Sequence, residues 1–170
     1  MTAVEGMAGT AGKSTWGSSL LPVGDATLAA RPRDHYAAAV LAELDEIDFT
    51  PDRMETGTGH EPEGGRELFL RLEWLPGHDG LAVPAVRAEG LTLEWSHIAG
   101  WLVRSGPDVN APKVARIADP PVVAHLAVHA SVCGIRCGCD KPDGTARWTG
   151  ADRLTAALDA YDEDAGVTLR

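Results

Sequence analysis

Cysteine is scarce in this chain, and lysine is scarcer than arginine. The 170 residues include 3 cysteines, and all of them fall within residues 133–139. An odd, clustered set of cysteines in a chain with no recognisable export signal argues against a disulfide framework. We therefore expect reduced thiols and a cytoplasmic protein. The preference for arginine, with abundant alanine and glycine, is typical of a GC-rich bacterial genome.

Long apolar runs and excess positive charge are also missing. No stretch approaches the roughly 20 apolar residues that cross a bilayer, so we expect no membrane partner. The net charge is -10, and an acidic surface repels phosphate backbones, which argues against nonspecific nucleic-acid binding. Acids gather in residues 43–63 around Arg53. They are interpreted either as a solvated face and loop or as a docking surface for a basic protein partner.

No complete catalytic motif is present. The chain contains no phosphate-binding loop with a Gly-Lys-Ser/Thr end, no Gly-x-Ser-x-Gly and no His-Glu-x-x-His. His78 and His97 fall in predicted turns between strands and are interpreted as surface histidines. The sequence thus assigns no catalytic residue and names no reaction.

Residues 1–31 are rich in Gly, Ala, Ser and Thr, and we interpret them as a disordered N-terminal arm. Residues 32–170 are predicted to form a single domain. A helix is expected near its start, because the apolar residues of 31–48 form one stripe, and a loop is expected over 50–65. The members of the stripe are Tyr36, Val40, Leu41, Leu44 and Ile47.

Several short segments alternate between apolar and polar residues, as half-buried strands do. Trp74, Trp95 and Trp101 lie in them and are predicted to anchor a core beneath the helices. The predicted strands cover 66–75, 81–88 (interrupted by Pro84), 91–95, 100–103 and 113–118.

A second helix is expected over 120–133, between Asp119 and Gly134, since aspartate, proline and glycine commonly mark helix ends. A cysteine-bearing loop at 133–148 and a C-terminal helix follow. Short connections favour antiparallel pairing. The predicted fold is therefore α+β, with a small antiparallel sheet of three to five strands and helices packed on one face.

Two stretches, "LEWSHIAGWLV" and "PPVVAHLAVHA", resemble a family of small uncharacterised actinobacterial proteins, a domain of unknown function. The resemblance covers roughly residues 33–131 and implies a tryptophan-bearing hairpin followed by a proline-initiated helix. It implies no activity, and it does not extend to the loop 50–65 or to the cysteines. The matching positions are Trp95, Gly100, Trp101, Pro120, Pro121, Val122 and Val123.

The stretch "HLAVHASVCGIRCGCD" carries soft metal ligands at short spacing. Three ligands at four-residue steps cannot share an ion, because His125 and Cys133 would be about 12 Å apart along a helix. The workable set is His129 and Cys133 from the last helical turns, with Cys137 and Cys139 folding back. One nitrogen and three sulfurs suit structural Zn²⁺.

Other interpretations of the same stretch stay open. His60, His78 or Asp140 could replace one ligand. His129 and Cys133 could instead be core side chains, because free cysteine behaves as a small hydrophobe. A nucleophilic Cys133 is disfavoured by its place at a helix C-terminus, where the dipole opposes a thiolate.

Two functions follow as hypotheses. The first is a non-enzymatic protein-interaction or regulatory module, acidic and stabilised by structural zinc, with a basic protein as its partner. The second is a small zinc- or thiol-dependent enzyme that uses the cluster from Cys133 to Cys139.

Overall fold

The structure is a computed structural model that describes residues 32–60, 66–139 and 144–167. The predicted arm, residues 1–31, lies outside the described residues. In chain order the elements are α2 (Pro32–Glu46), β1 (Arg53–His60), β2 (Arg66–Trp74), α3 (Pro84–Glu89), β3 (Leu91–Ser96), β4 (Gly100–Ser105), β5 (Asp108–Asn110), α4 (Pro120–Cys133) and α5 (Ala151–Val167).

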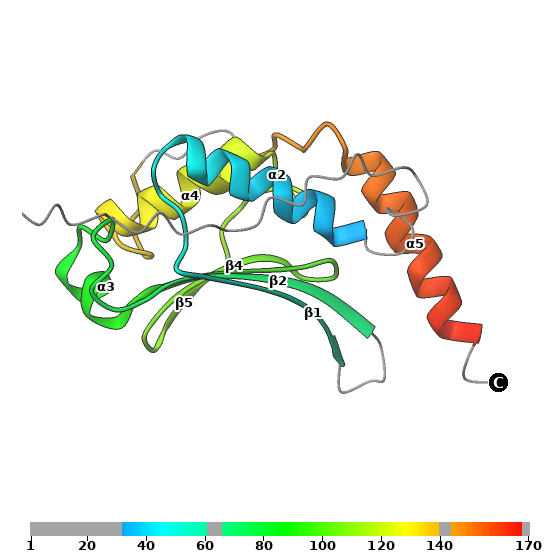
Figure 1. The fold of residues 1–170 in the computed structure, drawn as a ribbon, viewed down its shortest axis with the longest axis horizontal. Coiled ribbons are helices and arrows are strands. Elements are labelled where there is room, and N and C mark those ends of the chain that lie inside the picture. Colours follow the sequence, from blue (N-terminus) through cyan, green and yellow to red (C-terminus); the bar gives the residue numbers. More distant parts are fainter. Residues whose placement is uncertain (1–31, 61–65, 140–143, 168–170) are drawn as a thin grey trace, which may run out of the picture.

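One antiparallel sheet holds all five strands in the order β1-β2-β3-β4-β5. Strands that follow one another in the chain are also neighbours in the sheet, and all four pairs are antiparallel, including β2 and β3, between which α3 lies. Figure 1 shows α2 and α4 lying over the same side of this sheet, and α5 contacts α2. The predicted α+β class is confirmed. No helix in the described ranges is long and apolar enough to span a membrane.

The core centres on Tyr36, whose ring contacts three tryptophans. Its ring centroid lies 5.3 Å from those of Trp95 and Trp148, and 6.1 Å from that of Trp101. The hydroxyl donates to the Ala118 carbonyl at 2.7 Å and accepts from Trp101 Nε1 at 3.1 Å. The buried hydroxyl is thus satisfied both as a donor and as an acceptor, as buried polar groups usually are.

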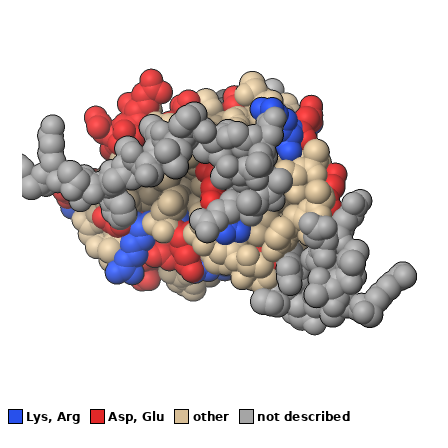
Figure 2. Space-filling model, turned by 45° about the vertical axis from the view of Figure 1, so that its right-hand side comes forward, with Lys and Arg blue, Asp and Glu red and all other residues tan. Residues whose placement is uncertain are grey.

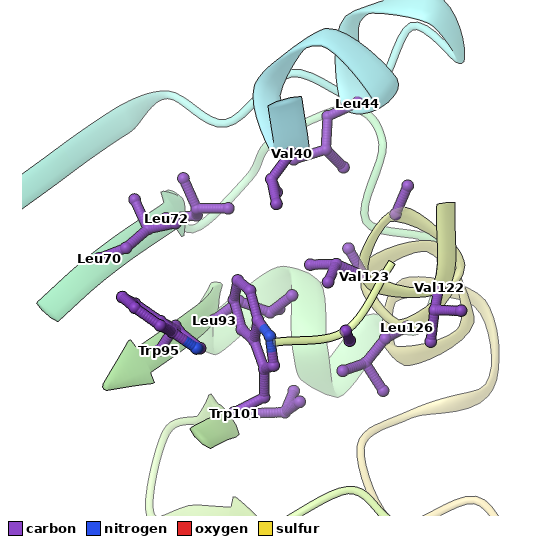
Figure 3. Close-up of a cluster of buried hydrophobic side chains, with 14 of the residues drawn as sticks. Val40, Leu44, Leu70, Leu72, Leu93, Trp95, Trp101, Val122, Val123 and Leu126 are labelled. Atoms are coloured by element: carbon purple, nitrogen blue, oxygen red, sulfur yellow. The ribbon is translucent and has the colours of Figure 1, made fainter. Parts of the chain in front are cut away.

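The predicted tryptophan anchors are confirmed, since Trp74, Trp95 and Trp101 are all buried. Figure 3 shows buried side chains from α2, from the sheet and from α4 that point toward one another. The labelled side chains from those elements are Val40, Leu44, Leu70, Leu72, Leu93, Trp95, Trp101, Val122, Val123 and Leu126.

The loop predicted over 50–65 is wrong in part, because residues 53–60 form the edge strand β1. Gly57 pairs with Phe69 of β2, and a Cβ built on Gly57 would lie only 2.5 Å from the Phe69 ring. An aromatic ring resting on a glycine stabilises a strand that glycine would otherwise weaken.

The strand predicted over 81–88 is wrong as well. Residues 84–89 form helix α3, with Pro84 in its first turn. Proline is favoured there because its missing N–H is not needed and its φ is preset for a helix. Ala82 and Val83 donate instead to the Ser131 carbonyl, at 3.1 and 2.9 Å, which ties this segment to α4.

The strand predicted over 113–118 is also wrong, and the sheet ends with the three-residue β5 instead. This segment runs beside 144–148, where Trp148 N–H donates to the Ile117 carbonyl at 3.1 Å. The Arg116 carbonyl accepts from Trp95 Nε1 at 2.7 Å. Its backbone thus bonds both to the Trp95 indole and to the segment 144–148, where Ala118 and Arg147 form an isolated antiparallel bridge instead of a continuous strand.

Candidate metal centre

Helix α4 supplies the first two ligands of the candidate centre. His129 and Cys133 stand one turn apart, which places their side chains on the same helix face. The helix stops at Gly134, whose φ of 85° suits a residue without a Cβ. The Gly134 N–H still donates to the Ala130 carbonyl at 3.0 Å. The chain therefore changes direction just after Cys133.

The segment after Gly134 is held in place by three contacts. Ile135 is buried, and its carbonyl accepts from Asn110 Nδ2 at 2.9 Å. Arg136 pairs with the Asp108 carboxylate at 2.5 Å, and Cys137 N–H donates to the Gly134 carbonyl at 3.2 Å. Strand β5 and a tight turn together return the chain toward the end of α4.

That reversal brings the four predicted ligands together. The candidate ligand atoms of His129, Cys133, Cys137 and Cys139 all lie within 4.8 Å of one another. His129 Nε2 is 2.7 Å from Cys139 Sγ. Cys137 Sγ is 2.9 Å from Cys139 Sγ and accepts from the Cys139 N–H at 3.4 Å.

The size of this cluster suits a tetrahedral ion. Bonds of about 2.0 Å to nitrogen and 2.3 Å to sulfur place the ligand atoms of a zinc tetrahedron roughly 3.3–3.8 Å apart. The two shortest contacts, 2.7 and 2.9 Å, are shorter than these edges, so both pairs of atoms would have to move apart to hold the ion. Small side-chain rotations would convert one arrangement into the other.

The cluster lies at the surface rather than in the core. Cys133 and Cys139 are exposed, and Cys137 is half-buried. The interpretation of His129 and Cys133 as core side chains is therefore wrong, because α4 turns its buried stripe, which includes Leu126 and Ala130, toward the sheet instead.

The thiols influence one another's ionisation. The pKa of Cys139 is raised to about 11 by its hydrogen bond with Cys137, by desolvation and by its hydrogen bond with Cys133. A thiol with a raised pKa is a poor nucleophile near neutral pH. Without a metal, this arrangement does not resemble an activated catalytic cysteine.

The remaining candidates lie apart from the cluster. The His125 ring stacks on that of His129 at 6.0 Å between centroids but does not join the group. His78 accepts from the Gly80 N–H at 3.0 Å, in a turn. The side chains of His60 and Asp140 lie outside the described part of the chain.

His97 was predicted to be a surface histidine in a turn, and the prediction of surface exposure is wrong. It is buried rather than on the surface. Its Nδ1 accepts from the Leu68 N–H at 3.0 Å, so the proton of the neutral ring is on Nε2, which faces the Asp162 carboxylate at 3.3 Å. Both ring nitrogens of His97 thus contact other parts of the protein. No sequence pattern could have indicated this, because Asp162 belongs to α5.

Among the surface hollows of the described residues, two bear on the function, one beside the cluster and one at β1. A groove of about 490 Å³ runs beside the cluster, and a hollow of about 430 Å³ lies at the start of β1. The groove is lined by Val83, Ala85, Val86, Glu89, Ser105, Pro107, Asp108, Cys133, Gly134, Ile135, Arg136 and Cys137. The hollow is lined by Asp52, Arg53, Met54, Glu55 and Glu73.

Comparison with known proteins adds no match: no family model, curated protein or solved structure is significantly similar to this chain.

Proposed function

We propose that this chain is a non-enzymatic, acidic protein-interaction module whose cysteine loop, residues 133–139, folds around a structural zinc ion. The observation that carries this proposal is the mutual proximity of His129, Cys133, Cys137 and Cys139, within 4.8 Å. Three sulfurs and one imidazole nitrogen are a complement that zinc takes in closed, four-coordinate structural sites. A closed site offers a substrate no coordination position.

The energetics of the cysteine loop support a stabilising ion. Fixing the backbone of one residue costs about 1–2 kcal/mol, whereas full burial of one isoleucine contributes only about 1.5–3 kcal/mol. Ile135 is the buried hydrophobic residue of this loop. Structural zinc contributes about 10–16 kcal/mol in small zinc-binding peptides, which is enough to offset the ordering of such a loop.

The surface charge supports a basic partner. Figure 2 shows Asp and Glu side chains gathered at several places on one side of the molecule. The hollow at β1 is lined by Asp52, Glu55 and Glu73 together with Arg53 and Met54, which is 47% exposed. Glu55 also pairs with Arg71 at 3.3 Å.

Strand β1 adds a backbone surface to that hollow. Among the described strands it pairs with β2 alone, at the edge of the sheet. An extended segment can add to such an edge through main-chain hydrogen bonds, with side-chain pockets giving specificity. The partner that fits is therefore an extended segment carrying arginine or lysine.

Metal analysis of protein purified without a histidine tag tests the zinc site. We expect one equivalent of zinc in the native protein and its loss in the Cys139→Ser variant. His125→Ala is the matched control, because His125 lies on the same helix outside the group, and it should keep its zinc. Protein that holds no zinc, or holds it equally well in Cys139→Ser, contradicts the proposal.

A charge-matched pair of variants tests the partner surface. Glu55→Gln with Glu73→Gln removes two charges from the hollow, and Asp45→Asn with Glu46→Gln removes two exposed charges from α2. A basic protein retained from lysate by the native chain and by the α2 variant, but lost by the hollow variant, supports the proposal. The proposal is contradicted if the native chain and the α2 variant retain no basic protein. It is also contradicted if the two variants retain it equally well.

The groove beside Cys133 and Cys137 favours the alternative, a small zinc- or thiol-dependent enzyme. Such an enzyme needs an open coordination position or an activated thiol. Cobalt substitution separates the two functions, because the visible bands of a closed site do not respond to added azide. Bands that shift on azide binding would favour the enzyme.

A further inference from the structure

The sulfurs of the cluster are reachable by small oxidants. Cys133 and Cys139 are exposed and Cys137 is half-buried. Cysteine oxidation follows thiolate character and exposure, and a metal holds its sulfur ligands in the thiolate form. Zinc bound here would thus keep the sulfurs ionised at the protein surface.

Two of the three sulfurs are placed to react with each other. Cys137 Sγ and Cys139 Sγ are 2.9 Å apart, and a disulfide needs them to approach to about 2.05 Å. Only Gly138 separates the two residues. No described atom lies within 4 Å of the Cβ position of Gly138, so the backbone has space to adjust to the bond.

We propose that Cys137 and Cys139 form a peroxide-sensitive dithiol whose oxidation to a disulfide releases the zinc ion. This inference rests on the proposed zinc site and adds its regulation. The exposed Cys139 thiolate attacks hydrogen peroxide, the O–O bond breaks, hydroxide leaves and a sulfenic acid forms.

The second step closes the disulfide. The Cys137 thiolate attacks the sulfenic sulfur, the S–S bond forms and a second hydroxide leaves, so that peroxide is reduced as the two thiolates are oxidised. His129 and Cys133 remain as ligands, and two ligands do not complete the tetrahedron that holds structural zinc. The loop 133–139 then loses its ion.

Peptide mapping can locate this disulfide. Trypsin cleaves after Arg116, Arg136 and Arg147, so Cys133 falls in the peptide 117–136 while Cys137 and Cys139 share the peptide 137–147. The zinc-loaded protein is treated with hydrogen peroxide, and the released zinc is followed with a chromogenic chelator. We expect the peptide 137–147 to become lighter by two hydrogen atoms, Cys133 to stay alkylatable, and zinc release to match disulfide formation one for one.

Variants keep the inference falsifiable. Cys133→Ser retains the dithiol and should form the same disulfide, whereas Cys139→Ser should form none. Peptides 117–136 and 137–147 joined by a disulfide would overturn the inference, as would zinc that stays bound with all three thiols alkylatable after peroxide. Reduced protein that binds no zinc refutes the proposed function and this inference with it, whereas zinc-loaded protein that forms no disulfide between Cys137 and Cys139 refutes this inference alone.

Discussion

The aromatic core and the cysteine loop are stabilised in opposite ways. Around Tyr36 the side chains are buried, and the polar atoms of Tyr36, Trp95 and Trp101 find protein partners, as the 2.7 Å bond to the Ala118 carbonyl illustrates. In the loop, two cysteines are exposed and Ile135 is the buried hydrophobic residue. The comparison teaches that the core is stabilised by its own side chains, whereas the loop has few buried contacts, which the proposed zinc ion would supplement.

The largest effect is expected from Trp95→Ala in the core. Trp95 is fully buried and donates to the Arg116 carbonyl at 2.7 Å, so its truncation leaves a cavity and an unpaired carbonyl. We expect a loss of about 3–5 kcal/mol in the free energy of unfolding, measured with urea. The loss should be the same with and without a chelator, and a chelator-dependent loss would erase the distinction between the two regions.

A surface valine provides the control for this truncation. Val132 lies next to the loop but is 56% exposed, so Val132→Ala should change the free energy of unfolding by no more than about 0.5 kcal/mol.

Removal of zinc should loosen the loop and spare the core. Cleavage by trypsin after Arg136, followed by mass spectrometry, should accelerate at least about tenfold on chelation, because local opening governs such cleavage. Cleavage after Arg104, within β4, serves as the internal reference and should not change. Equal acceleration at both sites would mean that zinc stabilises the whole domain.

The Tyr36→Phe variant tests how much the hydroxyl bonds of the aromatic core contribute to stability. Loss of its hydroxyl bonds should cost about 1 kcal/mol at neutral pH. Burial raises the pKa of the Tyr36 hydroxyl above its ordinary value, so the folded state retains a proton that the unfolded state loses near pH 10. Stability from this residue is therefore present below about pH 10 and falls as the pH rises further.

Urea titrations of both proteins between neutral and alkaline pH measure this difference. The native protein should lose more stability than Tyr36→Phe above about pH 10. Parallel losses in the two proteins would show that Tyr36 ionises equally in the folded and unfolded states.

The smallest effect is expected on the outer face of the sheet. The Glu94 carboxylate accepts from Arg71 at 3.0 Å and from Arg104 at 2.6 Å, but these charges are partly solvated. Glu94→Gln should cost about 0.2–1 kcal/mol, and the difference should shrink in high salt. A larger, salt-independent cost in urea unfolding would place part of the stability outside the aromatic core.

Much of the fold could be predicted because burial leaves a periodic pattern. The predicted stripe from Tyr36 to Ile47 matches α2 as far as Leu44, whereas Ile47 lies beyond the helix end and is 47% exposed. The alternation through Trp74 matches β2. One error, over 81–88, arose because Pro84 begins a helix rather than interrupting a strand, and another arose where a tertiary contact overrides local preference. Gly57 belongs to a strand because the Phe69 ring covers it.

The sequence indicated which residues could form the candidate site, but not where on the molecule the site lies. Helical spacing and the glycine after Cys133 indicated that these four residues could meet, which the structure confirms, but they left His60, His78 and Asp140 open as replacements. The exposure of these residues to solvent could not be predicted, because it depends on how α4 turns its buried face toward the sheet. The anchors Asp108 and Asn110 lie more than twenty residues earlier in the chain, and no local pattern links them to the loop.

X-ray absorption at the zinc edge of the untagged, zinc-loaded protein tests the central claim most directly. The predicted spectrum requires three sulfurs at about 2.3 Å and one nitrogen at about 2.0 Å around each zinc ion. A shell of oxygen and nitrogen atoms with one sulfur or none would contradict the proposal that the cysteine loop folds around zinc.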